Sequence, residues 1–415
     1  MIRRRPLLAG LATLVSLKPL LSWAQPATKK LKPKTPPVWT GFGLNGGSAQ
    51  ARYDLTREFV QKKYNHKLDE SEAFLFLVEP LKNLLASKQA GRVQFKDKVE
   101  FGENLLLGFA HDYETTVGAR VEKDGENANT LFIFMSGVGL ILSFDNGTGW
   151  RVLSSFPFML RMERPGGDLN DVRGKAVGYM NEAYTAYGNA FSHFLGRFNK
   201  WDQGFSSNYF ARLTKATIHK DAKDKLAAYR IQNVLNEELV GFSTSSALCD
   251  NLDIPLLPFQ ENDALAKRYA VKFANDLAAQ KEISIPDADL KFEVVLRDVD
   301  KQVTVSSQKG VNIVKRTVVM RVIVFDEYSS LPDKKILNVL ASSTGEDRMP
   351  LNTSEDDTPE RDLVFFDRLM SRTLTQLFKG LASKNESQLA SVEVKLSFVA
   401  PALPRLLELC TKTRG

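Results

Sequence analysis

The chain has 415 residues, which is enough for two or three domains that each bury a hydrophobic core. Hydrophobic residues make up 43% of the chain and charged residues 25%, which excludes a collagen-like chain, a bundle of membrane helices and a wholly disordered protein. The formal net charge is +7, but the first 40 residues carry eight basic and no acidic side chains, so the rest is nearly neutral and offers no clustered basic surface for nucleic acid.

Residues 1–24 resemble a bacterial signal peptide. Consecutive arginines precede an apolar stretch at 7–17, and Ser22 and Ala24 supply the small residues that a signal peptidase requires before its cleavage site. The apolar stretch is too short to span a hydrocarbon core of about 30 Å, so we expect cleavage and no integral membrane segment afterwards. The arginines also resemble the twin-arginine export motif, but such starts occur in Sec signals too. We predict a Gram-negative-type periplasmic or secreted protein, exported by Sec rather than by the twin-arginine route.

A segment rich in lysine and proline, residues 25–40, follows the signal. This composition favours an extended linker, either as a plain spacer or as a basic segment that binds an anionic surface. The next glycines, Gly41, Gly43 and Gly46, have the spacing of a dinucleotide-binding motif, but two prolines precede them where that motif requires a strand. We therefore interpret them as a flexible entry loop and predict no cofactor.

Residues 41–220 are predicted to form a first α+β unit. A capping box at Asp69 and Glu72 predicts a helix that ends near Gly91, and alternating residues predict a strand at 93–101. Apolar runs with hairpin turns at 124–125 and 146–147 predict further strands at 105–109, 116–122, 131–135, 140–145 and 150–162. A helix and a strand at 209–218 complete the unit. The helix carries a core-facing aromatic stripe of Tyr187, Phe191, Phe194 and Phe198.

Two predicted helices, 223–240 and 263–280, lead from this unit to the next, and we assign residues 221–285 to a helical connector. The second unit, residues 286–415, combines strands with a helix that begins at Thr358 and Pro359 and ends near residue 381. Its strands are expected at 291–305, 311–326, 335–343 and 391–399. The predicted fold class is therefore α+β, with two related antiparallel sheet-plus-helix units joined by a helical pair after a signal peptide.

An internal duplication would explain why strands, a helix and a final strand occur twice in the same order. Residues 142–145 are Leu-Ser-Phe-Asp and residues 323–326 are Ile-Val-Phe-Asp, at an offset of 181. The same offset would place the strand at 209–218 on the strand expected at 391–399. We therefore predict that the two units are related copies.

The second unit resembles the small α+β units of bacterial envelope proteins. The resemblance rests on a strand that ends at Phe325 and Asp326, a turn at 331–335, a strand at 336–341, and Gly345 ahead of an amphipathic helix. In these features it is similar to the curli-secretion protein CsgG, the amino-terminal domain of TolB and flagellar-assembly relatives. The resemblance implies docking onto envelope or secretion machinery without a catalytic site. This chain lacks the lipobox cysteine of many such proteins, so a lipid anchor is not implied.

Few residues of the sequence suggest catalytic chemistry. His111, Asp112 and Glu114 follow a predicted strand and form the alternative site, that of a hydrolase or metal-dependent enzyme in which an imidazole acts beside carboxylates. Neighbouring strand residues point to opposite faces, so His111 and Asp112 need a bulge to converge. The sequence contains no G-x-S-x-G nucleophile motif and no zinc-ligand spacing. We therefore expect a polar turn at this position rather than an active site, and we predict no metal.

Cys249 and Cys410 are the only cysteines. In an oxidising compartment we expect either a disulfide that fastens the C-terminal tail or two buried free thiols. Leucines at 403–409 are expected to pack an amphipathic turn against the body just before Cys410. Our functional hypothesis is an exported periplasmic, non-enzymatic protein that acts as a scaffold or docking component of a cell-envelope assembly, with envelope or secretion-machinery proteins as partners.

Overall fold

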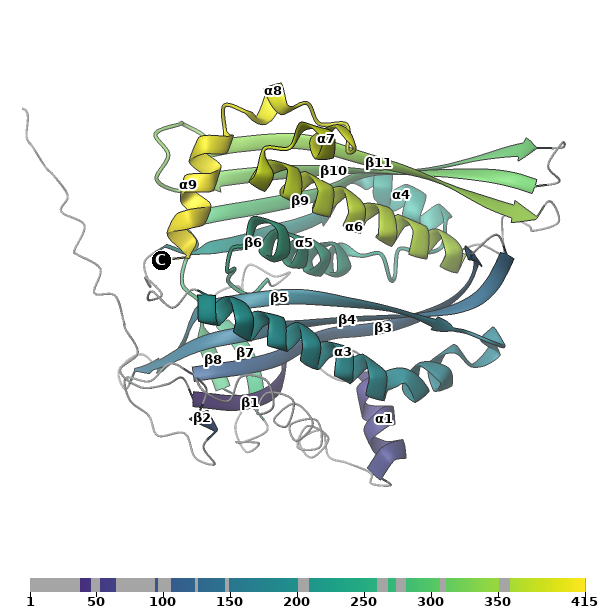
Figure 1. Ribbon diagram of the computed structural model, residues 1–415, viewed down its shortest axis with the longest axis horizontal. Helices are drawn as coiled ribbons and strands as arrows, with labels where there is room; N and C mark the ends of the chain where they lie inside the picture. Colours follow the sequence, from purple (N-terminus) through teal and green to yellow (C-terminus); the bar gives the residue numbers. More distant parts are fainter. Residues whose placement is uncertain are drawn as a thin grey trace, which may run out of the picture.

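The fold is that of a computed structural model, which describes residues 38–45, 53–64, 94–95, 106–123, 126–145, 149–200, 209–259, 268–273, 281–306, 311–350 and 359–414. The predicted signal peptide, most of the linker and the helix expected between residues 69 and 91 lie outside these ranges. The described chain is an α+β protein built from two β-sheets and the helices packed on them (Figure 1). This architecture confirms the predicted α+β class with two sheets.

The first sheet, sheet A, has seven strands among the described residues, in the order β2-β1-β3-β4-β5-β8-β7. The long strands β3, β4 and β5 are antiparallel, and β1 runs parallel to β3. A further pairing of β1 with β7 closes six of these strands into a ring. The strands are β1 (Val38–Asn45), β2 (Gln94–Phe95), β3 (Leu106–Lys123), β4 (Glu126–Asp145), β5 (Gly149–Pro165), β7 (Arg268–Phe273) and β8 (Lys281–Ser284).

The hairpins of sheet A agree with the sequence, but the strands are longer than expected. Lys123 pairs with Glu126 across the predicted two-residue turn, and Asp145 pairs with Gly149 across the next one. The five short strands predicted between residues 105 and 162 are three long ones, because 110–115 and 136–139 continue the ladder between β3 and β4. These stretches contain glycine and polar residues. A hydrophobic pattern alone does not distinguish such stretches from turns.

The second sheet, sheet B, has the order β11-β10-β9-β6. Its strands are β6 (Ala211–Ile218), β9 (Leu290–Ser306), β10 (Val311–Asp326) and β11 (Lys335–Pro350). The last three are antiparallel, and β6 runs parallel to β9. Alternate residues of β9, such as Phe292, Val294 and Leu296, are buried on the inner face. The predicted strands of the second unit that precede its long helix are confirmed, with β11 longer than expected.

Two helices, α5 (Glu237–Leu252) and α6 (Pro359–Ser383), lie between the sheets (Figure 1). Tyr113 of β3 contacts Phe242 of α5, and α6 packs against both β10 and β11. A third long helix, α3 (Val172–Lys200), covers the opposite face of sheet A. There Gly118 of β3 lies so close to α3 that a Cβ atom would come within 2.6 Å of Val172. The layers are therefore α3, sheet A, α5 with α6, and sheet B.

Shorter helices lie at the edges of these layers. They are α1 (Asp54–Tyr64), the 3₁₀ turn η1 (Leu169–Asp171), α4 (Lys220–Ala228), α7 (Glu386–Ala390), α8 (Leu396–Val399) and α9 (Leu403–Thr413). None of the helices in the described part of the chain is both long and apolar enough to cross a membrane.

A short extended segment joins the two sheets. Ser155 of β5 and Leu256 exchange both of their backbone hydrogen bonds, at 2.9 and 3.0 Å. The next residue, Leu257, donates its amide to Ala211 of β6 at 2.7 Å. The backbone of residues 256–257 therefore fixes the position of sheet B relative to sheet A.

The structure corrects four local predictions. Residues 223–240 do not form one helix, because α4 ends at Ala228 and α5 begins after the cap residue Asn236. Residues 268–273 of the helix predicted at 263–280 form β7, where sheet pairing overrides the helical pattern. Residues 391–399 contain α8 instead of a strand. Gly41 and Gly43 pair with β3 as part of β1, so their interpretation as a loop was wrong.

The two halves share an order of elements, namely three antiparallel strands followed by a long helix. These are β3, β4, β5 and α3 in one half and β9, β10, β11 and α6 in the other. The central strands β4 and β10 end at Asp145 and Asp326, at the offset found in the sequence. The same offset places β6 on residues that form α8, so the correspondence stops there. Descent from a duplication stays a prediction.

Candidate functional site

The predicted alternative site lies in the interior of the protein, on β3. The register of β3 against β4 shifts between His111 and Tyr113. With this irregularity in the strand, the side chains of His111 and Glu114 lie next to each other. The distance from His111 Nε2 to Glu114 Oε2 is 3.2 Å. The solvent-exposed fractions of His111, Asp112 and Glu114 are only 0%, 5% and 6%. The expected bulge is present, but the expected polar turn is a buried part of a strand.

Side chains from two helices complete what we name the Glu114 cluster: His111, Glu114, Thr56 of α1 and Tyr184 of α3. Thr56 donates its amide to Glu114 Oε1 at 2.9 Å and its hydroxyl to Glu114 Oε2 at 2.5 Å. Because that hydroxyl hydrogen is used, Tyr184 donates its own hydroxyl to the oxygen of Thr56. Burial, followed by the charge of Glu114, raises the pKa of Tyr184 well above its usual value.

The Glu114 cluster fastens α1 and α3 to sheet A. The hydroxyl of Tyr53, just before α1, also donates to the backbone oxygens of His111 and Asp112. Both carboxyl oxygens of Glu114 are used by donors within the protein. Among the residues that the structure describes, no group of three His, Cys, Asp or Glu side chains is arranged to hold a metal ion.

The two cysteines are buried free thiols in the structure. Burial raises the pKa of Cys410 to about 12. Residues 403–413 form the amphipathic helix α9, in which Leu406 and Leu409 are fully buried as expected. Arg414 donates to the backbone oxygen of Leu252 at the end of α5 at 2.7 Å. The tail is therefore fastened to α5 without a disulfide, and oxidation of the pair stays a prediction.

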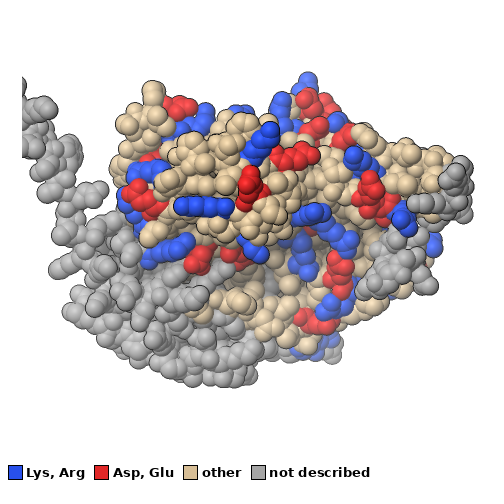
Figure 2. Space-filling view, turned by 45° about the horizontal axis from the view of Figure 1, so that its top comes forward, with Lys and Arg blue, Asp and Glu red and all other residues tan. Residues whose placement is uncertain are grey.

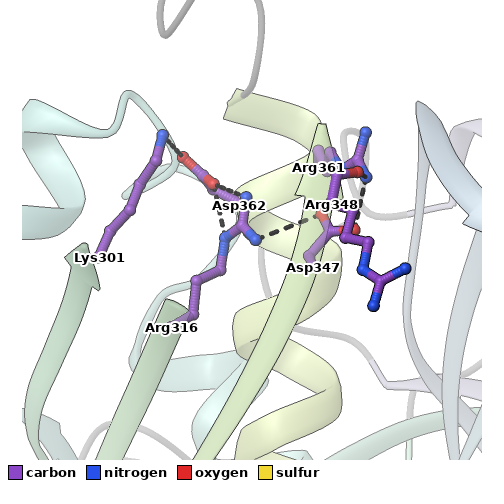
Figure 3. Close-up of polar contacts among 6 residues, drawn as sticks. All are labelled: Lys301, Arg316, Asp347, Arg348, Arg361 and Asp362. Carbon is purple, nitrogen blue, oxygen red and sulfur yellow. Dashed lines mark hydrogen bonds and ion pairs between the residues drawn. The ribbon is translucent and has the colours of Figure 1, made fainter. Parts of the chain in front are cut away.

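A second buried polar cluster, absent from the sequence predictions, lies where sheet B meets the start of α6 (Figure 3). We name it the Arg316 cluster: Lys301, Arg316, Asp347, Arg361 and Asp362. Arg316, which has no exposed surface, donates to Asp362 at 2.8 Å and lies 3.4 Å from Asp347. Lys301 donates to the other oxygen of Asp362 at 2.9 Å. Arg361 donates twice to Asp347, at 2.5 Å each.

Three neighbouring strands and one helix build the Arg316 cluster. The strands β9, β10 and β11 each supply one member, and α6 supplies two consecutive residues from its first turn. The sequence does carry a signal for this cluster. Val314, Arg316 and Val318 alternate along β10 and are all buried, so a cation stands in an otherwise apolar inward-facing series. A buried arginine requires carboxylate partners, which a strand pattern alone does not identify.

A cleft of about 390 Å³ lies between the β10–β11 turn and the start of α9. Asp326, at the end of β10, is fully buried and accepts from Arg405 at 2.6 Å. Tyr328 and Leu331 of the turn are 68% and 48% exposed. The lining residues are Asp326, Tyr328, Ser329, Ser330, Leu331, Ile336, Pro401, Ala402 and Arg405.

Groups behind the β10–β11 turn hold it in place. The rings of Tyr209 and Tyr328 lie 6.4 Å apart. Asp289 accepts a hydrogen bond from the amide of Phe210, and burial raises the pKa of Asp289 above its ordinary value. Burial also raises the pKa of Tyr209, and the charge of Asp326 adds to this effect. The turn therefore presents exposed apolar side chains on a well-anchored base.

The charged surface gives no sign of a nucleic-acid interface on the face shown in Figure 2, where basic and acidic side chains are interspersed.

No known protein family matches the sequence, and no curated protein matches it significantly. The resemblance to CsgG-like and TolB-like envelope units therefore stays a prediction.

Proposed function

We propose that the protein is an exported scaffold or docking component of a cell-envelope assembly, and that a partner protein binds at the cleft beside the β10–β11 turn. The observation that carries this proposal is the exposure of Tyr328 and Leu331 next to a cleft. Large apolar side chains exposed beside a concavity are typical anchors for a partner. The export-signal pattern at residues 1–24 supports the compartment.

The charges in and near the cleft define the chemistry of the partner. Arg405 neutralises Asp326, and Glu327 is paired with Lys291 and Lys334 at 2.5 Å each. The cleft therefore has little net charge, and its walls include Leu331, Ile336 and Pro401. We infer that the partner inserts an apolar side chain from a loop or an extended segment, while the serine hydroxyls at the rim bind its backbone.

The geometry gives less support to an enzyme that uses His111, Asp112 and Glu114. A catalytic acid or base must reach its substrate within hydrogen-bond distance. The side chains of His111 and Glu114 are at most 1% exposed and bonded to each other. Their arrangement is explained by the attachment of α1 and α3, so we do not propose this second function.

Site-specific photo-cross-linking in cells tests the proposed function. A photoreactive phenylalanine analogue placed at Leu331 should give a discrete adduct with an envelope protein, because this side chain stands at the cleft. The same analogue at Leu340 is the matched control, since Leu340 is 55% exposed but belongs to the middle of β11, outside the cleft lining. With the analogue at Tyr328 instead, which lines the same cleft, the Leu331→Asp substitution should abolish the adduct with the same partner.

Two results would contradict the proposal. One is an identical adduct pattern from positions 331 and 340, which would indicate non-specific encounter. The other is cell fractionation that finds the protein in the cytoplasm with residues 1–24 still attached.

A further inference from the structure

Two arginines of this protein combine carboxylate partners with an aromatic ring. The guanidinium carbon of Arg316, which is bound by the carboxylates of the Arg316 cluster, lies 4.7 Å from the centre of the Phe365 ring. The guanidinium carbon of Arg368, which donates to Glu163, lies 5.4 Å from the centre of the Phe132 ring. In both cases an acid binds the guanidinium group through its N–H groups, which lie in its plane, and leaves the face of the plane for a ring.

Arg405 of α9 has such acid partners but no ring. Its Nε and Nη2 atoms donate to Asp326 at 2.9 and 2.6 Å, and its Nη1 atom donates to Glu408 at 3.0 Å. Each nitrogen of the guanidinium group therefore has an acceptor within the protein. Within the described part of the chain, no aromatic ring lies over this group. The side chain of Arg405 is 38% exposed and lines the cleft beside the β10–β11 turn, so the face of its guanidinium group is available to a partner.

Tyr328 supplies an aromatic surface to the same cleft. It belongs to the β10–β11 turn, whereas Arg405 belongs to α9, and the cleft lies between these two elements. The hydroxyl of Tyr328 is hydrogen-bonded to Asp289, and the Tyr328 ring lies beside the Tyr209 ring. Tyr328 is nevertheless 68% exposed. It therefore offers a partner its ring rather than its hydroxyl.

An aromatic side chain fits these two surfaces better than a charged or an aliphatic one. A guanidinium face attracts the negative face of an aromatic ring, and two rings attract each other in offset or edge-to-face arrangements. A carboxylate of the partner would compete with Asp326 and Glu408 for the N–H groups of Arg405, and a cation would be repelled by Arg405. The cleft, at about 390 Å³, is within the range of pockets that hold small organic molecules, so it has room for a ring.

We propose that the partner inserts an aromatic side chain into the cleft, where its ring lies on the guanidinium face of Arg405 and packs against Tyr328. This inference rests on the proposed docking function and specifies the partner as a protein with a phenylalanine, tyrosine or tryptophan exposed on a loop or an extended segment. With this ring in place, Arg405 has the same set of partners as Arg316 and Arg368.

Short peptides test the choice of side chain on the purified full-length protein. The probe is Gly-Ser-Phe-Ser-Gly with blocked ends, and the control is the same peptide with cyclohexylalanine, which has a similar shape and hydrophobicity but no π system. Saturation-transfer NMR measures the two dissociation constants. The phenylalanine peptide should bind at least about threefold more tightly than the control. Equal affinities, or binding of neither peptide, would overturn the inference.

Three variants locate the preference for the phenylalanine peptide. Tyr328→Leu removes a ring from the cleft and should reduce this preference. Arg405→Lys keeps a positive charge for the buried Asp326 but has no planar face, and should abolish it. Phe398→Leu is the matched control, since Phe398 is a 76% exposed ring of α8 outside the cleft lining, and should keep it. Circular dichroism checks that each variant is folded. A preference that survives in both cleft variants, or that is lost in Phe398→Leu, would contradict the inference.

Cross-linking in cells separates failure of this inference from failure of the docking function. The photoreactive analogue at Leu331 reports the partner whichever side chain the partner inserts. Loss of the adduct in folded Arg405→Lys supports the inference. An adduct that persists unchanged in Arg405→Lys removes the aromatic anchor but leaves the docking function intact, whereas the lack of any adduct in the otherwise wild-type protein contradicts the docking function itself.

Discussion

The Glu114 cluster and the Arg316 cluster both attach helical residues to a β-sheet, but they differ in charge. The Glu114 cluster joins two helices to sheet A and the Arg316 cluster joins one helix to sheet B, each through side chains that solvent barely reaches. The Glu114 cluster contains one carboxyl group, and hydroxyl, amide and imidazole groups use both of its oxygens. The Arg316 cluster consists of charged groups alone, three cations and two carboxylates.

This difference sets the expected cost of breaking each cluster. Removal of one hydrogen-bond donor from a buried carboxyl group costs about 1–3 kcal/mol. Removal of one partner from a buried ion pair leaves a buried charge uncompensated and costs about 3–5 kcal/mol. Disruption of the Arg316 cluster should therefore destabilise the protein more than disruption of the Glu114 cluster.

The largest expected effect is in the Arg316 cluster. The Asp362→Ala substitution should lower the free energy of unfolding by about 3–5 kcal/mol, because it leaves the fully buried Arg316 and the nearly buried Lys301 without their shared carboxylate. Urea denaturation followed by circular dichroism measures the change.

Two comparisons sharpen this prediction. Glu360→Ala changes an exposed acid in the same turn of α6 and should alter the free energy of unfolding by less than about 0.5 kcal/mol. The paired change Arg316→Met with Asp362→Leu should be less harmful than Asp362→Ala alone, since Arg316 is then removed together with its partner and only Lys301 loses this carboxylate. A loss below about 1 kcal/mol for Asp362→Ala would show that the cluster is open to solvent.

A smaller effect is expected in the Glu114 cluster. The Thr56→Val substitution keeps the shape of the side chain but removes the hydroxyl that bonds both Glu114 and Tyr184. The free energy of unfolding should fall by about 1–3 kcal/mol, because the carboxyl group loses one buried donor. Thr185→Val, at an exposed position of α3, is the matched control. If the two variants have equal stability, the cluster does not fasten α1.

The sequence was sufficient for the parts of the fold that follow local rules. The turn between Lys123 and Glu126, the start of α6 at Pro359 and the strand β10 were all predictable from turn residues, capping and alternation. The strand β7 was not, because its six residues lie in a helical pattern and become a strand through pairing with β1 and β8.

The sites were less predictable than the fold for a related reason. His111 and Glu114 stood out in the sequence because histidine and carboxylates are close together there, but their burial depends on α1 and α3. The Arg316 cluster draws Lys301 from β9 and Asp362 from α6, which are 61 residues apart. Only the three-dimensional arrangement brings these charges together, so no local motif marks the cluster.

The smallest expected effect concerns the pH dependence of the Glu114 cluster. Burial and the charge of Glu114 raise the pKa of Tyr184 well above 10.0, the ordinary value, so the folded protein keeps the phenol proton where the unfolded chain loses it. Above the unfolded pKa the unfolded state binds fewer protons, and stability falls as the pH rises toward the folded pKa.

Tyr184→Phe should lower the free energy of unfolding by about 1 kcal/mol at neutral pH through the lost hydrogen bond, and this deficit in stability should shrink between about pH 9 and pH 11. Thr56→Val retains the phenol, so its alkaline loss of stability should stay close to that of wild type. Urea denaturation at several pH values measures the free energy of unfolding of both variants. A stability deficit of Tyr184→Phe that does not change with pH would mean that the Tyr184 phenol is not buried in the cluster.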